Sequence, residues 1–361
     1  MSPVVKALQH AAGIEPIVCV TAQHRQMLDQ VLHLFDIKPD YDLNLMRPDQ
    51  SLANLTASIL TGLDPVIREV QPDWVLVQGD TTTVMAASLL GFYHRVRVGH
   101  VEAGLRTDDR WQPFPEEINR RVAGVVADLH FAPTEHSRQN LLRENVTPES
   151  ILVTGNPAID ALQSIVKHPT PPEVHDLLER LDICSGRKQL IAITAHRREN
   201  LGQPMEDICR AIRILAETYP DRLALVWPVH LNPRVQEPAH RLLSDVPNVT
   251  LLPPLDYLPM IHMMKHAKLV LTDSGGIQEE ATCLGVPALV MREITERPEG
   301  VEAGVLKLVG MNTERIVTEA RALLEDEDAY RKMACCANPF GDGHAAERIV
   351  AALLERSGSG G

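Results

Sequence analysis

The sequence predicts an α/β protein with two doubly wound domains, each built on a parallel sheet with helices on both faces. Short apolar runs typical of buried strands alternate with segments whose apolar residues recur at helical spacing, and this alternation covers almost all 361 residues. A proline-dense and polar stretch at 167–188 interrupts the alternation once, which indicates a domain boundary. The length also suits two domains of ordinary size.

The first half of the chain alternates from its beginning. A helical pattern over 2–12 comes first, and the apolar run at 17–20 predicts a strand. The helix over 52–70 contains Pro65, which lacks an N–H group, so we expect a break near that residue. Further strands are predicted at 74–77, 96–98, 129–132 and 151–153, and further helices at 24–35, at 84–90 and from Pro115 onward.

The second half repeats the pattern after 167–188, which we interpret as a linker. The first domain is therefore predicted to cover 1–166 and the second 189–343, and the Ser/Gly tail at 357–361 is predicted to be disordered. Strands are predicted at 190–194, 223–227, 249–252, 269–271 and 288–291, and helices at 204–218, 257–266, 313–324, 329–336 and 344–356.

Composition argues against several classes of function. The formal net charge is −13 and the isoelectric point is about 5.6, which disfavours nucleic acid or an anionic membrane as a partner. No apolar run approaches the roughly 20 residues that cross a bilayer, and the first residues lack a signal-peptide pattern. The six cysteines show no Cys-x-x-Cys spacing, as is typical of reduced thiols in a cytoplasmic protein. No His-x-x-x-His pair accompanies carboxylates, so we predict no metal site.

The stretch 269–284 has the clearest pattern for anion binding. An apolar run at 269–271 predicts a buried strand, a Ser-Gly-Gly turn follows at 274–276, and 277–284 predicts a helix. Such a turn leaves unpaired N–H groups at the positive end of the helix dipole, and glycine lets a diphosphate approach the backbone. Glu280, one helical turn later, is placed to reach a ribose hydroxyl. An ordinary strand-to-helix connection would show the same pattern.

Polar residues gather at the predicted carboxyl ends of strands, where ligands bind in open α/β sheets. Singly, each has a simpler interpretation: Asp80 as a helix N-cap, Glu116 as a residue that favours a helix N-terminus, and 197–199 as a solvated turn. Together they predict a cleft with acidic groups from one domain and anion-binding groups from the other, which suits a nucleotide-linked substrate. The strand-end residues are Gln23, His24, Arg25, Asp80, His100, Glu102, Thr194, His196, Arg197, Arg198, Glu199, His230, Asn232, Asp273, Ser274, Gly276, Arg292, Glu293, Glu296 and Arg297.

Several blocks, such as Gly-His-Val-Glu-Ala-Gly-Leu-Arg-Thr at 99–107, closely resemble those of the non-hydrolysing UDP-N-acetylglucosamine 2-epimerases. The resemblance implies a glycosyltransferase-B-like fold, in which two Rossmann-like domains face a cleft and the last helix, 344–356, packs back on the first domain. It also implies interconversion of UDP-GlcNAc and UDP-ManNAc in a homodimer, without a metal or nicotinamide cofactor. The other matching blocks are 20–25, 79–83, 115–117, 196–200, 228–233, 272–280 and 295–299.

The family's reaction eliminates UDP to give 2-acetamidoglucal and then adds UDP back with a proton on the other face. It needs acid/base groups at the sugar and stabilisation of the departing diphosphate. The resemblance implies UDP-GlcNAc both as substrate and as allosteric activator. The implied acid/base carboxylates are Asp80, Glu102 and Glu116, with His196 assisting near the diphosphate. The implied contacts are Ser274, Gly275 and Gly276 to phosphate, Glu280 to ribose, Arg297 to diphosphate or sugar, and Gln23, Arg25 and His230 to the activator.

The beginning of the chain departs from the family pattern. The family's first strand and its Gly-Thr-Arg-Pro-Glu loop have no counterpart, since Met1 aligns inside the family's first helix. We therefore expect the chain as written to be poorly stable or nearly inactive; equal turnover and thermal stability beside an N-terminally extended form would contradict this. Two alternatives stay open: a hydrolysing relative that releases ManNAc and UDP, and a non-catalytic UDP-sugar-binding protein.

Overall fold

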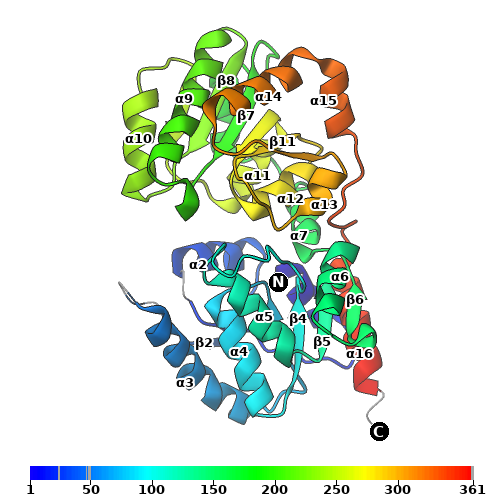
Figure 1. Ribbon diagram of the computed structural model, residues 1–361. Coiled ribbons are helices and arrows are strands. Elements are labelled where there is room, and N and C mark those ends of the chain that lie inside the picture. The colour runs from blue at the N-terminus through cyan, green and yellow to red at the C-terminus, as the bar shows by residue number, and fades with distance from the viewer. Residues whose placement is uncertain (23–24, 46, 48–49, 359–361) are drawn as a thin grey trace. The chain divides into compact units, whose positions relative to one another are not determined.

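The computed structural model describes residues 1–22, 25–45, 47 and 50–358. The chain forms two compact units (Figure 1), one of residues 1–161 and 340–361 and the other of residues 162–339. The chain leaves the first unit inside helix α7 (Pro157–Ile165) and returns to it at Phe340.

The described part of the first unit contains one main parallel sheet, a separate pair of short strands, and helices on both sides of the main sheet. Its strands are β1 (Cys19–Val20), β2 (Tyr41–Asp42), β3 (Trp74–Gln78), β4 (Arg97–Val101), β5 (Leu129–Ala132) and β6 (Ile151–Val153). They pair as β3-β4-β5-β6 and, separately, as β1-β2. Its helices are α1 (Ser2–His10), α2 (Arg25–Leu34), α3 (Leu52–Val70), α4 (Thr82–Tyr93), α5 (Glu116–Val126), α6 (Glu135–Arg143), the short η1 (Pro148–Ser150), the start of α7, and α16 (Ala345–Gly358).

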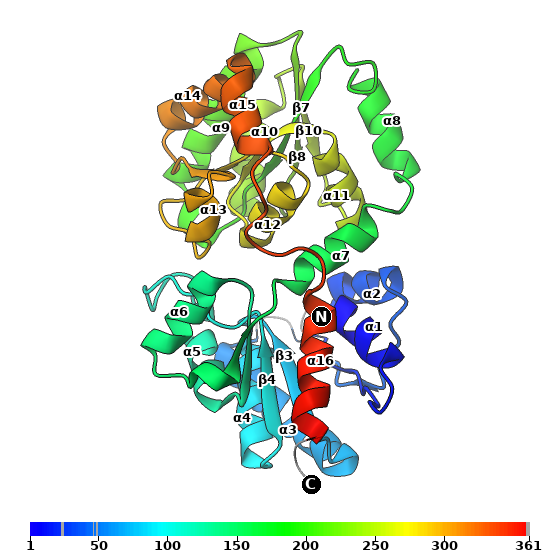
Figure 2. The same ribbon diagram turned by 90° about the vertical axis from the view of Figure 1, so that its right-hand side faces the viewer.

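Residues on opposite faces of the main sheet pack against different helical layers. In β4, Val98 packs in a core with α3 and α4, whereas Val101 packs in a core with α1 and α16. Figure 2 shows α1 and α16 side by side, as their contacts require. Because helices cover both faces of the sheet with apolar contacts, polar side chains can gather at the carboxyl ends of β3 and β4 and in the loops that follow them.

The second unit is a parallel sheet with helices. Its strands are β7 (Gln189–Thr194), β8 (Leu223–Pro228), β9 (Val249–Leu252), β10 (Ala267–Thr272), β11 (Ala288–Val290) and β12 (Leu306–Leu308). Its helices are α8 (Pro172–Arg180), the short η2 (Arg198–Asn200), α9 (Gln203–Thr218), α10 (Pro233–Leu243), α11 (Tyr257–Lys265), α12 (Gly275–Cys283), α13 (Pro298–Glu302), α14 (Thr313–Glu325) and α15 (Glu327–Ala334). None of the helices that the structure describes in either unit has the length and apolar character needed to cross a membrane.

The strand order β12-β11-β10-β7-β8-β9 determines where the second unit can bind a ligand. β7 comes first in the chain, and the sheet grows from it in one direction through β8 and β9 and in the other through β10 to β12. The loops after β7 and β10 therefore diverge, and such a switch point forms the ligand crevice of doubly wound sheets. Because Thr194 pairs with Thr272, the residues that follow these two strands begin side by side.

Three predicted features of the chain differ from the structure. Helix α3 continues through Pro65 without a break, and three of its buried residues, Leu63, Val66 and Ile67, flank that proline. The stretch 167–188, predicted to be a linker, contains helix α8 with a buried apolar face and belongs to the second unit. Helix α12 begins at Gly275 with Ser274 as its N-cap, earlier than the predicted start.

The ends of the predicted pattern also need correction. Strands β2 and β12 were not predicted, and β1 is shorter than predicted. Helix α16 extends through Gly358, into the tail that was predicted to be disordered. Residues 359–361 lie outside the described part of the chain.

Candidate functional site

Strands β3 and β4 bring Glu102 to one edge of the first sheet. Their register pairs Gln78 with Val101, so the loops that start at Gly79 and Glu102 leave the sheet together. Both residues have left-handed backbone, with φ of 82° and 62°, a conformation that is uncommon for a residue with a side chain. The Glu102 Oε2 atom accepts a hydrogen bond of 3.2 Å from Gln78 Nε2. The backbone thus places the Glu102 carboxylate at the carboxyl end of the sheet.

Helix α5 orients Asp80. The Asp80 Oδ2 atom accepts hydrogen bonds from Arg120 Nε at 3.0 Å and Nη2 at 2.7 Å, and its carbonyl oxygen accepts one from Asn119 Nδ2 at 2.9 Å. Arg120 is only 3% exposed, whereas the Asp80 side chain is 27% exposed. The N-cap of α4 is Thr81, which rules out the simpler interpretation of Asp80 as that cap. A buried guanidinium therefore holds a carboxylate that solvent can still reach.

The two adjacent glutamates at the start of α5 have different surroundings. Glu117 is fully buried and accepts hydrogen bonds from Arg120 Nη1 at 2.9 Å and from the Thr107 N–H at 3.2 Å. Glu116 Oε2 is buried and has no hydrogen-bond partner among the described residues. Because such an atom is costly unless it gains a partner, Glu116 has the oxygen that a ligand could use. Within the described part of the chain, no three metal-ligating side chains cluster here or elsewhere.

The turn after β10 has the features of an anion site. The N-cap Ser274 makes no side-chain cap hydrogen bond, so no side-chain cap satisfies the N–H groups in the first turn of α12. A Cβ on Gly275 would lie 2.5 Å from Arg297 Nη1 and 2.9 Å from Glu296 Oε1, so any side chain at this position would displace these two buried and paired side chains. A Cβ on Gly276 would meet no atom within 4 Å. Open space before a helix N-terminus, with a guanidinium nearby, favours phosphate.

Arg297 and Glu280 are buried beside this turn. The Arg297 side chain is 7% exposed, its Nη1 lies 2.9 Å from Glu296 Oε1, and its Nε bonds to Glu279. Burial raises the pKa of Glu280 to about 7, and a hydrogen bond to Tyr257 and the Arg297 charge oppose that shift. Burial, together with the Glu280 charge, raises the pKa of Tyr257. Glu280 therefore changes its charge near neutral pH, at the position predicted to bind ribose.

The structure brings together two histidines that were predicted to have different roles. The rings of His196 and His230 stack, with centroids 5.5 Å apart and planes inclined by 17°. They follow β7 and β8, which are neighbours in the sheet. Burial lowers the pKa of His196, and the carboxylate of Asp273 opposes that shift. His230 Nδ1 accepts a hydrogen bond of 3.0 Å from the Asn232 N–H.

The other residues predicted to bind an activator belong to the first unit. Arg25, at the start of α2, forms ion pairs with Asp29 at 3.0 Å and with Asp42. An anionic ligand at Arg25 would have to compete with these two carboxylates. Gln23 lies outside the described residues.

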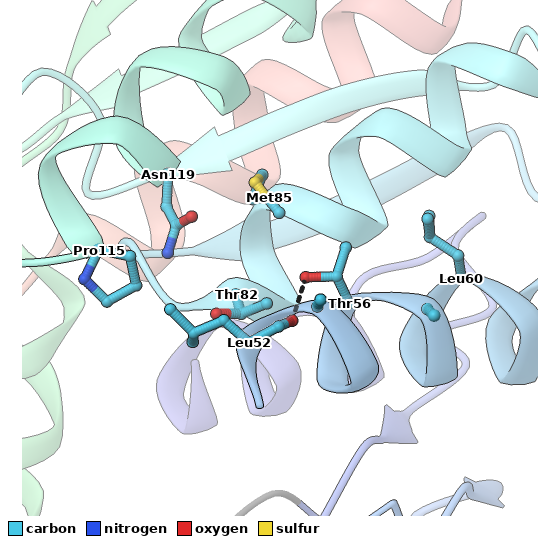
Figure 3. A pocket seen from close by; sticks show the side chains of 9 residues that line it. Leu52, Thr56, Leu60, Thr82, Met85, Pro115 and Asn119 are labelled. Atoms are coloured by element: carbon cyan, nitrogen blue, oxygen red, sulfur yellow. Dashed lines mark hydrogen bonds between the residues drawn. The ribbon is translucent and has the colours of Figure 1, made fainter. Parts of the chain in front are cut away.

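An apolar pocket of about 420 Å³ lies in the first unit between α3, α4 and the start of α5 (Figure 3). It adjoins the carboxylate region, because Asn119 lines the pocket and also donates to the Asp80 carbonyl oxygen. None of its lining residues is charged, so the pocket does not suit a diphosphate. The lining residues are Leu52, Ala53, Thr56, Ala57, Leu60, Thr82, Met85, Pro115 and Asn119.

Known proteins match this chain over nearly its whole length. A family model described as UDP-N-acetylglucosamine 2-epimerase matches residues 6–354. The UDP-N-acetylglucosamine 2-epimerase of Yersinia pestis is 54% identical over 355 residues, which cover 98% of this chain and 94% of that protein. The chain belongs to the UDP-N-acetylglucosamine 2-epimerase family.

Solved structures of UDP-N-acetylglucosamine 2-epimerases agree with this assignment. The enzyme of Neisseria meningitidis bound to UDP-GlcNAc has a TM-score of 0.91 and 47% identity, covering 98% of this chain and 96% of that chain. The enzyme of Methanocaldococcus jannaschii in complex with UDP-GlcNAc and UDP has a TM-score of 0.83 and 32% identity, covering 98% and 95%. These likenesses confirm the predicted α/β fold of the glycosyltransferase-B type.

The residues that orient the candidate site of this epimerase-family chain could not be identified from the sequence patterns. The spacing of Glu117 and Arg120 on one helix could have indicated an ion pair, but not the bond from Arg120 to Asp80. Tyr257, which contacts Glu280, carries no signal in its surrounding sequence. Asp273 was noted only as a polar residue after a strand, yet it makes three hydrogen bonds to the loop after β7.

Proposed function

We propose that this protein interconverts UDP-GlcNAc and UDP-ManNAc by inverting carbon 2 of the sugar without releasing free sugar. The family match over residues 6–354, with a 47% identical relative whose structure is bound to UDP-GlcNAc, supports this most strongly. The six cysteines are free, which fits the cytoplasmic location predicted from their spacing.

In this proposal the second unit binds UDP. The N–H groups in the first turn of α12 and the Arg297 guanidinium face the diphosphate, and Glu280 accepts hydrogen bonds from the ribose. His196, at the switch point of the sheet, assists near the diphosphate. As the bond between carbon 1 and the UDP oxygen breaks, negative charge grows on the diphosphate. Fixed dipoles and cations that already point at that position lower the barrier, because they need no reorganisation.

The carboxylates of the first unit move protons at the sugar. Elimination removes the proton from carbon 2 together with UDP from carbon 1, and re-addition returns a proton to the other face. Because the proton leaves one face of the sugar ring and returns to the other, acid/base groups are needed on both sides of the ring. We assign this need to three carboxylates. Glu102 is held by its backbone conformation, Asp80 is oriented by Arg120, and Glu116 has a buried oxygen that lacks a hydrogen-bond partner among the described residues.

Proton NMR in D₂O tests the reaction. UDP-GlcNAc should give UDP-ManNAc with deuterium at carbon 2 and no free sugar. Free ManNAc and UDP as the main products would instead identify a hydrolysing enzyme, and UDP binding without turnover would identify a binding protein. Asp80→Asn, Glu102→Gln and Glu116→Gln should each lower turnover by roughly 10²–10⁴-fold. Glu135→Gln removes an exposed carboxylate of the same unit and is the matched control.

We further propose that the protein is a homodimer that uses the outer surface of α3, α4 and α5. These helices pack side by side in the first unit (Figure 1). Helix α4 exposes Phe92 and Tyr93, and α5 exposes Ile118 and Val125, with Val125 85% exposed. Exposed apolar side chains grouped on one face are typical of a subunit interface. Val125→Asp should yield monomers in sedimentation equilibrium with an unchanged melting temperature, and a monomeric parent protein would contradict the proposal.

We also propose that UDP-GlcNAc acts as an activator through Gln23, Arg25 and His230. Arg25 supplies a cation and His230 an imidazole that stacks on His196. Turnover should then depend sigmoidally on UDP-GlcNAc concentration, and Arg25→Ala should reduce the Hill coefficient. A hyperbolic dependence in the parent protein would contradict the assignment.

A further inference from the structure

Asp273 connects the two loops at the switch point of the second sheet. Its Oδ2 atom accepts hydrogen bonds from the backbone N–H groups of His196 and Arg197, both at 2.8 Å, and from Asn200 Nδ2 at 2.9 Å. The side chain is fully buried. Asp273 itself lies between the end of β10 and Ser274, the N-cap of α12. One carboxylate therefore fixes the His196 loop against the turn that is proposed to bind phosphate.

The second oxygen of Asp273 points to a further role. Asp273 Oδ1 is buried, has no hydrogen-bond partner among the described residues, and lies 3.6 Å from His196 Nδ1. That distance is too long for a hydrogen bond, and a ring movement of about 0.7 Å would form one of ordinary length. Hydrogen bonds in active sites often tighten when substrate binds. A buried carboxylate oxygen facing an imidazole nitrogen favours the tautomer that carries its proton on that nitrogen.

We infer that Asp273 is a positioning residue for His196: Oδ2 fixes the loop, and Oδ1 holds the ring as the Nδ1–H tautomer. Nε2 is then the nitrogen that remains for the substrate. This inference rests on the proposed function only for the statement that His196 acts on the substrate. The His196 and Arg197 N–H groups are already bonded to Asp273, so they are not the donors for phosphate, and the first turn of α12 takes that role.

Besides burial, which lowers the pKa of His196 most, four titratable or charged groups among the described residues act on it. Asp273, from the end of β10, and Glu199, from the loop of His196 itself, favour the imidazolium form. Arg197, from the same loop, and His230, from the loop after β8, disfavour it. Removal of the Asp273 charge should therefore lower the pKa of His196 further and move the acid limb of the activity profile to lower pH.

The tautomer can be measured in the parent protein without substrate. Nitrogen-15 NMR of histidine-labelled protein, with His196 assigned by its loss in His196→Ala, distinguishes the two tautomers. We expect Nδ1 protonated and Nε2 bare at pH 8. The opposite tautomer would overturn the inference. Because no turnover is needed, this result decides the role of Asp273 even if the protein fails to convert UDP-GlcNAc, which would overturn only the proposed function.

Asp273→Asn tests the consequence for catalysis. The amide keeps an oxygen for the loop N–H groups but can present N–H to His196 Nδ1, which favours the wrong tautomer. We expect kcat to fall about 100-fold or more, with KM changed less than about 3-fold. In the His196→Ala background the same change should lower kcat by no more than about 2-fold. An equal loss in both backgrounds would show a purely structural role and overturn the inference.

Asp245→Asn is the matched control for loss of one carboxylate from the same unit. Asp245 is exposed and pairs with Arg213, away from the β7 and β10 loops. It should leave kcat and its pH profile unchanged. Should Asp273→Asn fail to fold, the tautomer of the parent protein alone decides between the two outcomes.

Discussion

Gly275 and Gly276 are adjacent in sequence and share one helical turn, yet alanine should act oppositely on stability at the two positions. Both lie at the start of α12, where the helix N-terminus is proposed to bind the diphosphate. A Cβ on Gly275 would lie 2.5 Å from Arg297 Nη1, and one on Gly276 would meet nothing within 4 Å. Alanine at Gly275 therefore tests the need for close packing, whereas alanine at Gly276 tests the need for open space for a ligand.

The expected loss of stability in Gly275→Ala depends on how far Arg297 can move away from the new methyl group. Its guanidinium is buried and paired with Glu279 and Glu296, so it cannot turn away without breaking these contacts. Overpacking of this kind costs about 1–3 kcal/mol, and the preference of a helix for alanine over glycine offsets about 0.5–1 kcal/mol. The net loss is then up to about 2.5 kcal/mol, which lowers the melting temperature of a unit of this size by up to roughly 10 °C. Gly276→Ala has only the favourable contribution and should melt at or slightly above the parent temperature.

Thermal unfolding and UDP titration calorimetry on the same preparations test this reasoning. We expect Gly275→Ala to lose stability and UDP affinity together. Gly276→Ala should keep its stability but bind UDP about 10-fold more weakly, because its methyl group occupies the open space before the helix. Equal melting temperatures of Gly275→Ala and Gly276→Ala would contradict this expectation, because Arg297 would then move away from the new methyl group without any loss of stability.

Two further predictions concern pH. Burial lowers the pKa of His100 and of His130 to about 4, so between pH 6.5 and 4 the unfolded chain takes up protons that the folded chain does not. The free energy of unfolding should therefore decrease as the pH is lowered from 6.5 to 4, by up to roughly 3 kcal/mol per histidine. Above pH 7 these two histidines should not affect it. Thermal unfolding should show His130→Gln losing part of this dependence; an unchanged dependence in that variant would contradict it. Glu280, with its pKa raised to about 7 by burial, should deprotonate between pH 6 and 8, so calorimetry should show UDP affinity rising by up to about 10-fold over that range. An equal rise of UDP affinity with pH in Glu280→Gln would show that another group causes the pH dependence.

The main strands and helices could be predicted because buried parallel strands must be apolar on both faces. Runs such as β8 and β10 are buried almost throughout and stand out between polar loops. Strands β1 and β2 have two residues each and no periodicity to detect. At Pro65 the local rule gave the wrong answer, since burial of the neighbouring apolar residues outweighs the missing N–H group. Helix α8 was hidden by the prolines that precede it.

The candidate site could be predicted only where its signal is local. The Ser-Gly-Gly turn before a helix is visible in a few consecutive residues, and in the structure Gly275 packs closely against Arg297 whereas Gly276 faces open space. The partners that orient the site are distant in sequence: Arg120 lies 40 positions from Asp80, and Asp273 lies 77 positions from His196. Their roles follow from strand order and register, which place loops from separate strands at one edge.

Charge balance bears on how the proposed UDP site of the second unit would attract a diphosphate. Arg297 is bonded to two carboxylates, and Arg292 contacts Glu199 at 3.2 Å and Glu296 at 2.8 Å, so neither guanidinium contributes a full unbalanced charge. The chain as a whole is also strongly acidic. The first N–H groups of α12, where the N-cap Ser274 makes no side-chain cap hydrogen bond, are a further source of positive potential. In the proposed UDP site, Arg297 therefore both holds the turn in place and contributes part of its charge, and the N–H groups of α12 contribute the rest of the attraction for a diphosphate.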